Sequence, residues 1–450
     1  MFAYWKLHRI PILLVLGSLM FYGVFAYDLQ REDFPKLISL YGALFFLYIK
    51  LVRLQAWNFK FLLVAGVLLR LVFLWAEPNL SQDFYRFLWD GELIAQGMNP
   101  YSFTPDELLA DPNFSLPNAN ELHEGMGTLS ARHYSNYPPM NQLLFALSAF
   151  LGMGSTLAGV VWMRIFIILA DLGIVLFGKK LLAHLEMDKG MVFWYFLNPL
   201  VVIELTGNLH FEGVMLFFFV WAMYLVVKGK LWFAGPVYAA SIFLKLVPIL
   251  FLPLFLPYLG FKKSVAFYTM VGIGGLVMVL PFYSPSLAEH YGQTIGLWFS
   301  NFEFNAGIYN LVKKIGMIRY EVKPWVLIKE YGFLLKLYIP LVVALLTFFK
   351  PHRDLKAIFG SMFLILGLYY ALSSTVHPWY LVFLLFLGLF TKYRVVMVWT
   401  ATVMLSYYAY SQTDFKENLW LLGLEYLAVF GYLGYEIHKN HNNLGLIRKK

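Results

Sequence analysis

The chain has 450 residues, of which 60% are hydrophobic and 19% aromatic, while only 14% are charged. About a quarter of the residues in a soluble domain are charged, so this composition excludes water as the main solvent of the protein. The net charge of +9 does not indicate nucleic acid as a partner, because the basic residues form short clusters between apolar runs and at the C-terminus. Such clusters are typical of cytoplasmic loops. The absence of cysteine excludes disulfides and thiolate chemistry.

Apolar runs long enough to cross a membrane follow one another along the chain. They lie at 10–27, 36–54, 60–76, 156–178, 190–206, 211–228, 264–281, 333–349, 357–375, 395–411 and 419–437, with a shorter run at 378–391. We therefore predict an all-α polytopic bundle of about 12–14 spans, forming one integral membrane unit over residues 1–450. We predict that the protein lies in the cell (inner) membrane. If the basic clusters are on the cytoplasmic side, both termini are cytoplasmic as well.

Two segments do not fit simple spans. Residues 231–257 begin and end at cytoplasmic lysine clusters, so we expect either two half-helices that meet near Lys245 and Pro248 or two full spans. Residues 140–152 remain on the outer side by parity, and we expect them to lie in the membrane interface. Broken helices are tolerated in a membrane only where protein or a polar cavity covers the backbone.

The same parity places two long loops outside the cell membrane. The first, 77–141, follows the third span and holds nine acidic residues against two basic ones. Loops of this length are usually functional or disordered, and the many aromatic residues of this one favour order. We predict that it carries the chemistry. The second outer loop covers 282–332.

The first loop begins with Ser81-Gln82-Asp83-Phe84-Tyr85-Arg86-Phe87-Leu88-Trp89-Asp90-Gly91. If this stretch is helical, Asp83, Arg86 and Asp90 share one face. A carboxylate there could act as a general base, and the arginine could bind a phosphate. A solvated helix with an ordinary Asp–Arg pair explains the spacing equally well.

Further polar and aromatic residues stand at positions that could line a substrate pocket. Lys245 lies in an apolar broken segment, where it needs a partner such as a lipid phosphate or a protein carboxylate, unless it extends its charge to the membrane surface. His377 could donate to a phosphate, although a membrane-interface belt by itself explains its aromatic neighbours. The candidate pocket residues are Tyr85, Asp90, Asn99, Tyr101, Tyr137, Asn208, His210, Glu212, Trp379 and Tyr380.

No motif for a metal, a nucleotide or a dinucleotide occurs in the chain. We accordingly predict no cofactor and no metal ligands, with a divalent cation left open. A nucleotide-activated donor has no visible binding site.

Five motifs together resemble those of bacterial glycosyltransferases with the GT-C fold, in the same order along the chain. The resemblance is closest to the mannosyltransferases around family 87, and more distant to the catalytic subunit of the first GPI mannosyltransferase. The motifs are QDFYRFLWDG with GMNPY, YPPMNQLLFAL, NPLVVIELTGNLHFEG, FLKLVPILFLP and HPWYLVFLLF.

This resemblance implies a transferase that moves a sugar from a polyprenyl-phosphate donor to a lipid or glycan acceptor. The sugar implied by the resemblance is mannose. The resemblance further implies an extracytoplasmic active site, inversion in one displacement, and a catalytic carboxylate in the first outer loop. Relatives commonly carry two adjacent acids before the Tyr-Arg pair, and here the first is Gln82. Asp83 alone therefore has the role of base, with Arg86, Lys245 and His377 as candidates for the donor phosphate.

A multispan transporter or lipid flippase is the alternative, since it shares the span count and the broken segment near Lys245. Transporters usually show repeated halves and charged sites near the membrane midplane. This sequence shows no such halves, and its polar clusters lie at the outer ends of spans. An O-antigen polymerase or ligase is a third class, which the early position of the acidic loop disfavours.

Overall fold

The computed structural model describes residues 2–352 and 354–447. Within these residues the secondary structure is helical, apart from an isolated β-bridge between Phe304 and Thr375. Six helices are long and apolar enough to cross a membrane: His8–Tyr27, Phe34–Gln55, Thr156–His184, Phe261–Phe282, Pro324–Phe349 and Leu355–Leu372. The all-α polytopic class is thereby confirmed. The count of 12–14 spans stays a prediction, because the other apolar helices are shorter or bent.

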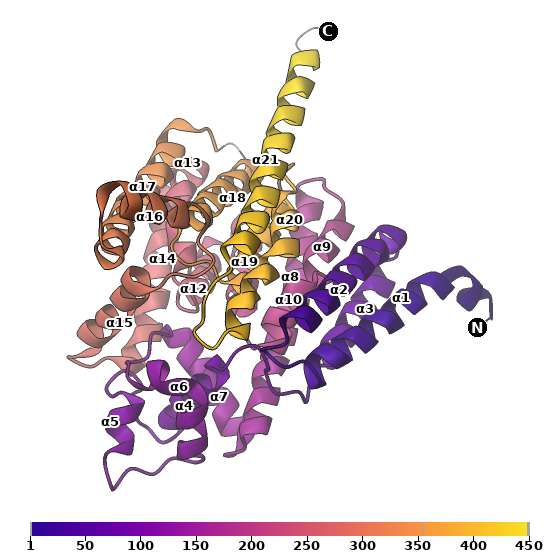
Figure 1. Cartoon of the computed structure of the whole chain (residues 1–450). Helices are drawn as coiled ribbons and strands as arrows, with labels where there is room; N and C mark the ends of the chain where they lie inside the picture. Colours follow the sequence, from indigo (N-terminus) through magenta and orange to yellow (C-terminus); the bar gives the residue numbers. More distant parts are fainter. Residues whose placement is uncertain (1, 353, 448–450) are drawn as a thin grey trace.

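The first three helices form one side of the molecule, at the indigo end of the colour scale (Figure 1). They are α1 (Phe2–Tyr27), α2 (Phe34–Gln55) and α3 (Phe59–Leu71). The side chain of Asp33 caps α2 by accepting from the backbone N–H of Lys36, and Asn58 caps α3 in the same way. Because α3 ends at Leu71, the apolar run at 60–76 is helical only in part.

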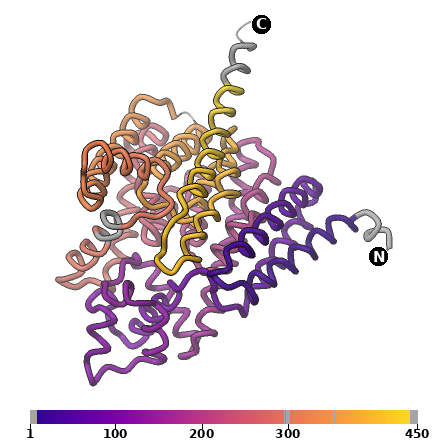
Figure 2. The backbone as a smooth tube through the Cα atoms, in the orientation of Figure 1, coloured from indigo at the N-terminus to yellow at the C-terminus, as the bar shows by residue number. Residues whose placement is uncertain are grey.

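The long acidic loop is folded, as its aromatic content predicted. It contains α4 (Asp83–Ala95), α5 (Pro105–Leu109) and α6 (Ala119–Ala131), and it leads into α7 (Pro139–Gly152). These four helices gather at one end of the molecule (Figures 1 and 2). Helix α4 packs closely on α7, because Gly91 lets the backbone of Phe145 approach. This packing fixes the start of α4 above the rest of the bundle.

The run at 190–206 is not the continuous span that the sequence predicted. After α8 (Thr156–His184), it is divided into the 3₁₀ turn η1 (Lys189–Val192), α9 (Phe193–Phe196), α10 (Pro199–Val201) and the π-helical turn η2 (Val202–Gly207). The two parts meet at an angle of 54°. Pro199 causes the break, because it lacks an N–H and disfavours helical geometry at the residue before it. Asn198 caps the second part by accepting from Leu200 N–H.

The break that the sequence places near Lys245 is present. Helix α11 (Glu212–Val227) is followed by α12 (Leu231–Ile242), and a turn carrying Lys245 then leads into η3 (Val247–Leu254), α13 (Phe255–Leu259) and α14 (Phe261–Val279). The turn is held to the first loop, since Met140 N–H donates to the carbonyl of Phe243 and the Asn141 side chain donates to that of Leu244.

The predicted second loop is largely helical. The turn η4 (Leu280–Phe282) is followed by α15 (Leu287–Asn301), α16 (Gly307–Tyr320), α17 (Pro324–Phe349) and α18 (Leu355–Leu372). Helix α17 begins at Pro324, nine residues before the apolar run that predicted it, because proline is favoured in a first helical turn.

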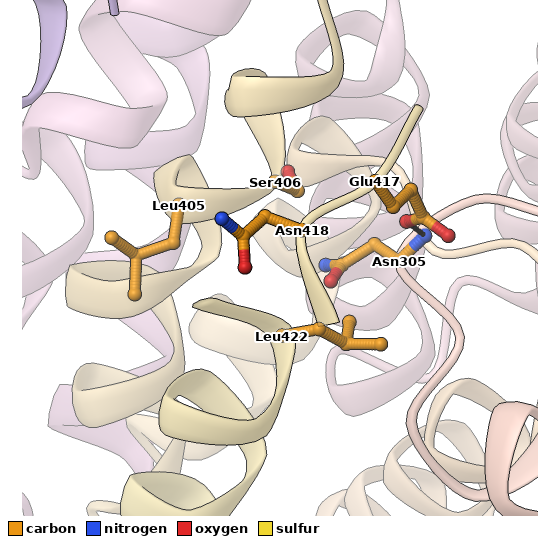
Figure 3. A pocket seen from close by; sticks show the side chains of 6 residues that line it. All are labelled: Asn305, Leu405, Ser406, Glu417, Asn418 and Leu422. Carbon is orange, nitrogen blue, oxygen red and sulfur yellow. Dashed lines mark hydrogen bonds between the residues drawn. The ribbon is translucent and has the colours of Figure 1, made fainter. Parts of the chain in front are cut away.

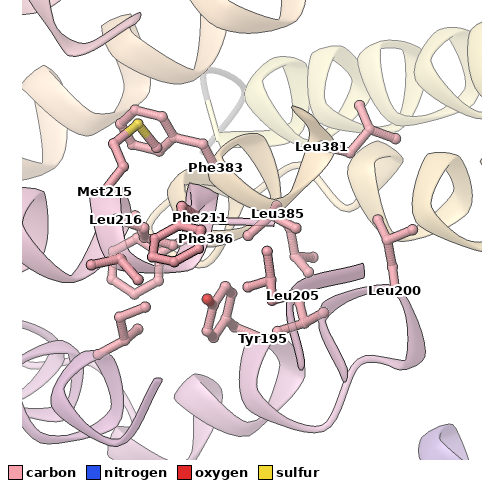
Figure 4. Packing of buried hydrophobic residues seen from close by; sticks show 14 of the residues in the cluster. Tyr195, Leu200, Leu205, Phe211, Met215, Leu216, Leu381, Phe383, Leu385 and Phe386 are labelled. Carbon is pink, nitrogen blue, oxygen red and sulfur yellow. The ribbon is translucent and has the colours of Figure 1, made fainter. Parts of the chain in front are cut away.

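The last elements complete the core around the broken helix. They are η5 (Pro378–Tyr380), α19 (Leu381–Gly388), α20 (Val395–Thr402), the 3₁₀ segment η6 (Val403–Ser411) and α21 (Leu419–Ile447). Leu381, Phe383 and Phe386 of α19 are fully or almost fully buried against the broken helix and α11 (Figure 4). For example, the rings of Phe219 and Phe383 meet edge to face with centroids 4.8 Å apart.

Charged side chains inside this core are paired or bound to backbone carbonyls. Arg70 of α3 forms a fully buried ion pair with Asp171 of α8, with 2.8 Å between Nε and Oδ2. Arg164 of α8 donates to the carbonyls of Leu74, Thr206 and Gly207. Arg164 thereby holds the end of η2, close to the residues described next.

Candidate functional site

Asp83 is the first residue of α4, and its side chain is 42% exposed. The neighbouring side chains of Phe84, Phe87 and Trp89 are buried, so they fix the helix in the core. Among the hydrogen bonds of the described residues, none is made by the carboxylate of Asp83. The carboxylate of Asp83 therefore stands at the start of a packed helix, and its oxygens are free to accept hydrogen bonds.

His210 faces Asp83 from the turn between η2 and α11. Its Nε2 lies 3.9 Å from Oδ2 of Asp83, while its Nδ1 lies 3.0 Å from the backbone oxygen of Glu204. The preceding residue, Leu209, has a φ of 62°, a left-handed conformation that is costly for a leucine. This strained turn directs the histidine ring toward α4.

Trp379 joins two histidines in one stack. The ring of His210 lies on Trp379 with 3.7 Å between centroids, and the ring of His377 lies on it with 4.4 Å between centroids. His377 also stacks on Phe304, which belongs to the segment between α15 and α16. Trp379 therefore belongs to the same cluster of side chains as His210 and His377. The sequence alone was equally consistent with a residue of the membrane-interface belt.

Lys245 enters the same cluster from the turn after α12. Its ammonium group pairs with the carboxylate of Glu212, the first residue of α11, and lies 4.7 Å from the centroid of the Tyr380 ring. Of the two partners that the sequence left open for this lysine, the structure provides the protein carboxylate. The side chain remains 36% exposed, so it can also reach an anion.

Arg31 is a cation of this site that the sequence did not reveal. It lies in the short turn between α1 and α2, with its guanidinium 3.7 Å above the ring centroid of Tyr410. None of the ion pairs between described side chains includes Arg31, and its buried Nε has no hydrogen-bond partner among them. In the sequence it precedes Glu32 and Asp33, so it resembles an ordinary charged residue of a solvent-exposed loop.

The electrostatics connect these groups. Burial raises the pKa of Asp83, and the positive charges of His210, Lys245 and Arg31 oppose that rise. Burial lowers the pKa of His377 to about 3, helped by the charge of Lys245. His377 is therefore neutral near pH 7, and it could serve a phosphate as a hydrogen-bond donor but not as a cation.

Two of the predicted residues on α4 lie elsewhere. Arg86 donates to Asp90 and to the carbonyls of Ser130 and His133, so its guanidinium is used inside the folded loop. Asp90 is fully buried and also accepts from Ser135 and Gln142. Helical spacing placed both on the face of Asp83, but the fold of the loop closes over them. The geometry does not support Arg86 as a phosphate ligand or Asp90 as a pocket residue.

Asn99 and Tyr101 connect the two loops. The Asn99 side chain donates to the carbonyl of Phe282, and the Tyr101 ring packs edge to face on that of Phe282. Within the first loop, the Tyr101 hydroxyl donates to the carbonyl of Tyr137. Tyr101 is completely buried. Both residues therefore hold the first loop in place, and a role of partly exposed Asn99 in a substrate pocket stays a prediction.

The remaining pocket candidates contact different parts of the structure. Tyr137 packs edge to face on Phe87, and burial raises the pKa of its phenol, with a smaller contribution from the charge of Asp83. The ring of Tyr85 packs against Gly125 of α6. Asn208 donates to the carboxylate of Glu204.

A separate small pocket lies between η6, the start of α21 and the segment before α16 (Figure 3). It is lined by Asn305, Leu405, Ser406, Glu417, Asn418 and Leu422. Figure 3 shows Asn305 beside Glu417, and the backbone N–H of Asn305 donates to that carboxylate. The pocket contains none of the predicted site residues.

No group of three or more His, Cys, Asp or Glu side chains in the described part of the chain is arranged to hold a metal ion. The absence of a cofactor stays a prediction.

Comparison with known proteins identifies the family of the chain. A family model described as the N-terminal domain of alpha-(1->6)-mannopyranosyltransferase matches residues 35–260, which is half of the chain. The chain belongs to this family. The match includes Asp83, His210 and Lys245 but ends before His377, and it begins after Arg31.

Two curated members of the family align with part of the chain. Alpha-(1->6)-mannopyranosyltransferase B of Corynebacterium glutamicum is 29% identical over 156 residues, which are 34% of this chain and 24% of that protein. Alpha-(1->6)-mannopyranosyltransferase A of Mycobacterium tuberculosis is 25% identical over 154 residues, which are 34% and 28% of the two chains. The matched segment thus spans about a quarter of each of these mannopyranosyltransferases. The resemblance to bacterial mannosyltransferases is confirmed.

Proposed function

We propose that the chain is a membrane glycosyltransferase that moves mannose from a polyprenyl-phosphate donor to a hydroxyl of a lipid or glycan acceptor. The observation that carries this proposal is the cluster of Asp83, His210, Lys245 and His377, which come from four separate segments. His210 lies 3.9 Å from Asp83, Trp379 stacks on both histidines, and the Tyr380 ring contacts His377 and the ammonium group of Lys245. Family membership and the names of the two relatives support mannose as the sugar.

Asp83 is the general base of the proposed reaction. It takes the proton of the acceptor hydroxyl as that oxygen forms a bond to the anomeric carbon, and the bond from this carbon to the phosphate oxygen breaks at the same time. The phosphate leaves with the electron pair, and the configuration at the anomeric carbon is inverted. A raised pKa suits a base, because a carboxylate that binds a proton more tightly accepts it more readily.

Lys245 and Arg31 hold the leaving phosphate. The phosphate already carries negative charge, so its departure is helped by cations and hydrogen-bond donors and needs no proton. Lys245 is partly exposed beside Tyr380, and Arg31 has no carboxylate partner among the described ion pairs. His377 is neutral and partly exposed, so its ring can donate one hydrogen bond to the phosphate.

The reaction is proposed to occur on the extracytoplasmic side. The positive-inside rule, applied to the basic clusters, places α4 and the turn between α1 and α2 on that face. Six long apolar helices support an integral membrane protein in which a lipid-linked donor is within reach.

The test is reconstitution of the full chain in lipid with polyprenyl-phosphate-mannose and lipid or glycan acceptors. We expect sugar transfer by the wild type and a loss of at least about 100-fold in Asp83→Asn, which is the usual contribution of a general base. Asp106→Asn is the matched control, because Asp106 is another partly exposed acid of the same loop. Full transfer by Asp83→Asn would contradict the mechanism. Movement of donor lipid between leaflets without sugar transfer would instead favour the flippase alternative.

A further inference from the structure

We propose that Glu204 is a positioning residue, which fixes the ring of His210 so that its Nε2 faces the carboxylate of Asp83. This assignment rests on the proposed role of Asp83, and it adds a residue that acts through another without contacting substrate. The contacts that carry it come from three elements that are distant in sequence: η2, η6 and η5.

Glu204 is fully buried in the π-helical turn, and both of its carboxylate oxygens are engaged. Its Oε1 accepts from the hydroxyl of Tyr407 at 2.8 Å, and its Oε2 accepts from the side chain of Asn208 at 3.2 Å. Oε2 also lies 3.2 Å from Nδ1 of His210. A buried carboxylate held on several sides in this way is a rigid reference point for the histidine ring.

The imidazole has one orientation available in this setting. Nδ1 lies between the backbone oxygen and Oε2 of Glu204, two acceptors, so Nδ1 carries a proton. Trp379 stacks on the ring at 3.7 Å and fixes its plane. Nε2 is then directed at Asp83, and among the described residues this buried nitrogen has no hydrogen-bond partner.

The arrangement Glu204–His210–Asp83 has an electrostatic consequence. The charge of His210 opposes the rise in the pKa of Asp83 that burial causes, and the size of this effect depends on where Glu204 holds the histidine ring. Removing Glu204 weakens this effect on Asp83, although the two acids do not touch. The other groups that face the pair are kept in every variant below; they are Arg31, Tyr137, Glu212, Lys245, His377, Tyr380 and Tyr410.

The protonation of Asp83 can be measured without any sugar substrate. A carbodiimide reacts with the protonated carboxyl group, so its rate of addition to Asp83, followed by mass spectrometry of the full chain in nanodiscs, falls as pH rises through a midpoint. We expect His210→Gln to move this midpoint upward by about one pH unit, because an opposite charge at this range has been lost. Glu204→Gln should move it in the same direction by less.

Three comparisons decide the proposal. If Glu204 acts through His210, adding Glu204→Gln to His210→Gln produces no further shift. Thr206→Val is the matched control, since Thr206 is equally buried in the same turn and its hydroxyl has no partner among the described residues; its midpoint should equal that of the wild type. An unchanged midpoint in His210→Gln, or shifts of the two single variants that add, would overturn the assignment.

The labelling experiment tests the positioning role, and the transfer assay tests the proposed function, so either proposal can be refuted without the other. Midpoint shifts without any sugar transfer by the wild type would leave the positioning role intact and refute the proposed function. Sugar transfer with unchanged midpoints would support the function and refute the positioning role. Should Glu204→Gln fail to fold, Glu204→Asp is the second variant, because it keeps the charge and shortens the side chain that holds Nδ1 of His210; an upward shift of the midpoint supports the positioning role, and an unchanged midpoint overturns it.

Discussion

At the scale of single residues, the site is a balance of charges around one partly exposed acid. Asp83 faces three groups that carry or can carry positive charge: His210, Lys245 and Arg31. Lys245 is neutralised in part by Glu212, whereas none of the described ion pairs includes Arg31. An anion that enters the cluster would therefore meet Arg31 as the least compensated cation.

We predict that Arg31→Ala weakens binding of the donor more than it slows catalysis. Loss of a charge-assisted contact to phosphate costs about 1.5–3 kcal/mol, which corresponds to a rise of roughly 10- to 100-fold in KM for polyprenyl-phosphate-mannose. Arg31→Lys should restore part of the affinity. The control is Lys36→Ala, which removes a cation near the same turn that pairs with Asp28. A KM that rises equally in both variants would contradict a specific role for Arg31.

The pH dependence of transfer follows from Asp83. A base works in its ionised form, so activity is present above its pKa and is lost as pH falls through it. Because burial raises this pKa, the acid limb of kcat/KM should lie above the ordinary value for an aspartate. His377, with a pKa of about 3, stays neutral through that range and adds no step. An acid limb at or below the ordinary value would contradict Asp83 as the base.

At the scale of elements, irregular helices place the functional side chains. The bend of 54° before Pro199 and the π-turn after it place buried Glu204 beside His210, in the turn that faces Asp83. The break after α12 places Lys245 beside Glu212. In both segments the interruption places a polar side chain among other protein groups. Broken membrane helices are tolerated where protein covers the backbone in this way.

Helix α4 depends on its close approach to α7. A side chain at Gly91 would collide with the backbone carbonyl of Phe145, so Gly91→Val should destabilise the protein by at least about 1–3 kcal/mol and displace Asp83. Thermal unfolding in detergent measures the loss. Gly42→Ala of α2, where an added Cβ meets nothing within 4 Å, serves as the control and should unfold at or above the wild-type temperature. Equal melting of Gly91→Val and wild type would show that α4 can shift without cost.

At the scale of the whole molecule, one buried ion pair joins the N-terminal helices to the central bundle. Arg70 and Asp171 are both fully buried, and Asp171 also accepts from the hydroxyl of Tyr195. The guanidinium lies 3.9 Å from the ring centroid of Phe196, in the broken helix. The pair thus connects α3, α8 and the segment that leads to His210.

Asp171→Asn should destabilise the fold by about 3–5 kcal/mol, because it leaves the charge of Arg70 buried without a counterion. The double variant Arg70→Met with Asp171→Leu removes both charges and should recover much of that loss. Melting temperatures of the two variants in the same detergent check this. A double variant that is less stable than Asp171→Asn would show that the pair has a role beyond neutralisation.

The sequence by itself determined the class of the protein and most members of its site. Apolar runs set the all-α membrane class, since a lipid-spanning backbone must satisfy its own hydrogen bonds. Helical spacing and the family resemblance marked Asp83, and a cluster of polar residues at the end of a span marked His210. Lys245 and His377 were marked as polar groups within or beside apolar runs. Such local signals need no knowledge of the fold.

Only the tertiary structure decided which of these residues meet. Helical spacing put Arg86 and Asp90 beside Asp83, but long-range contacts with Ser130, His133 and Ser135 enclose them. Arg31 and Glu204 gave no decisive signal, because one looks like an ordinary loop charge and the other like one polar residue among several. Their roles arise from contacts across hundreds of residues, such as Tyr407 with Glu204, which no local pattern encodes.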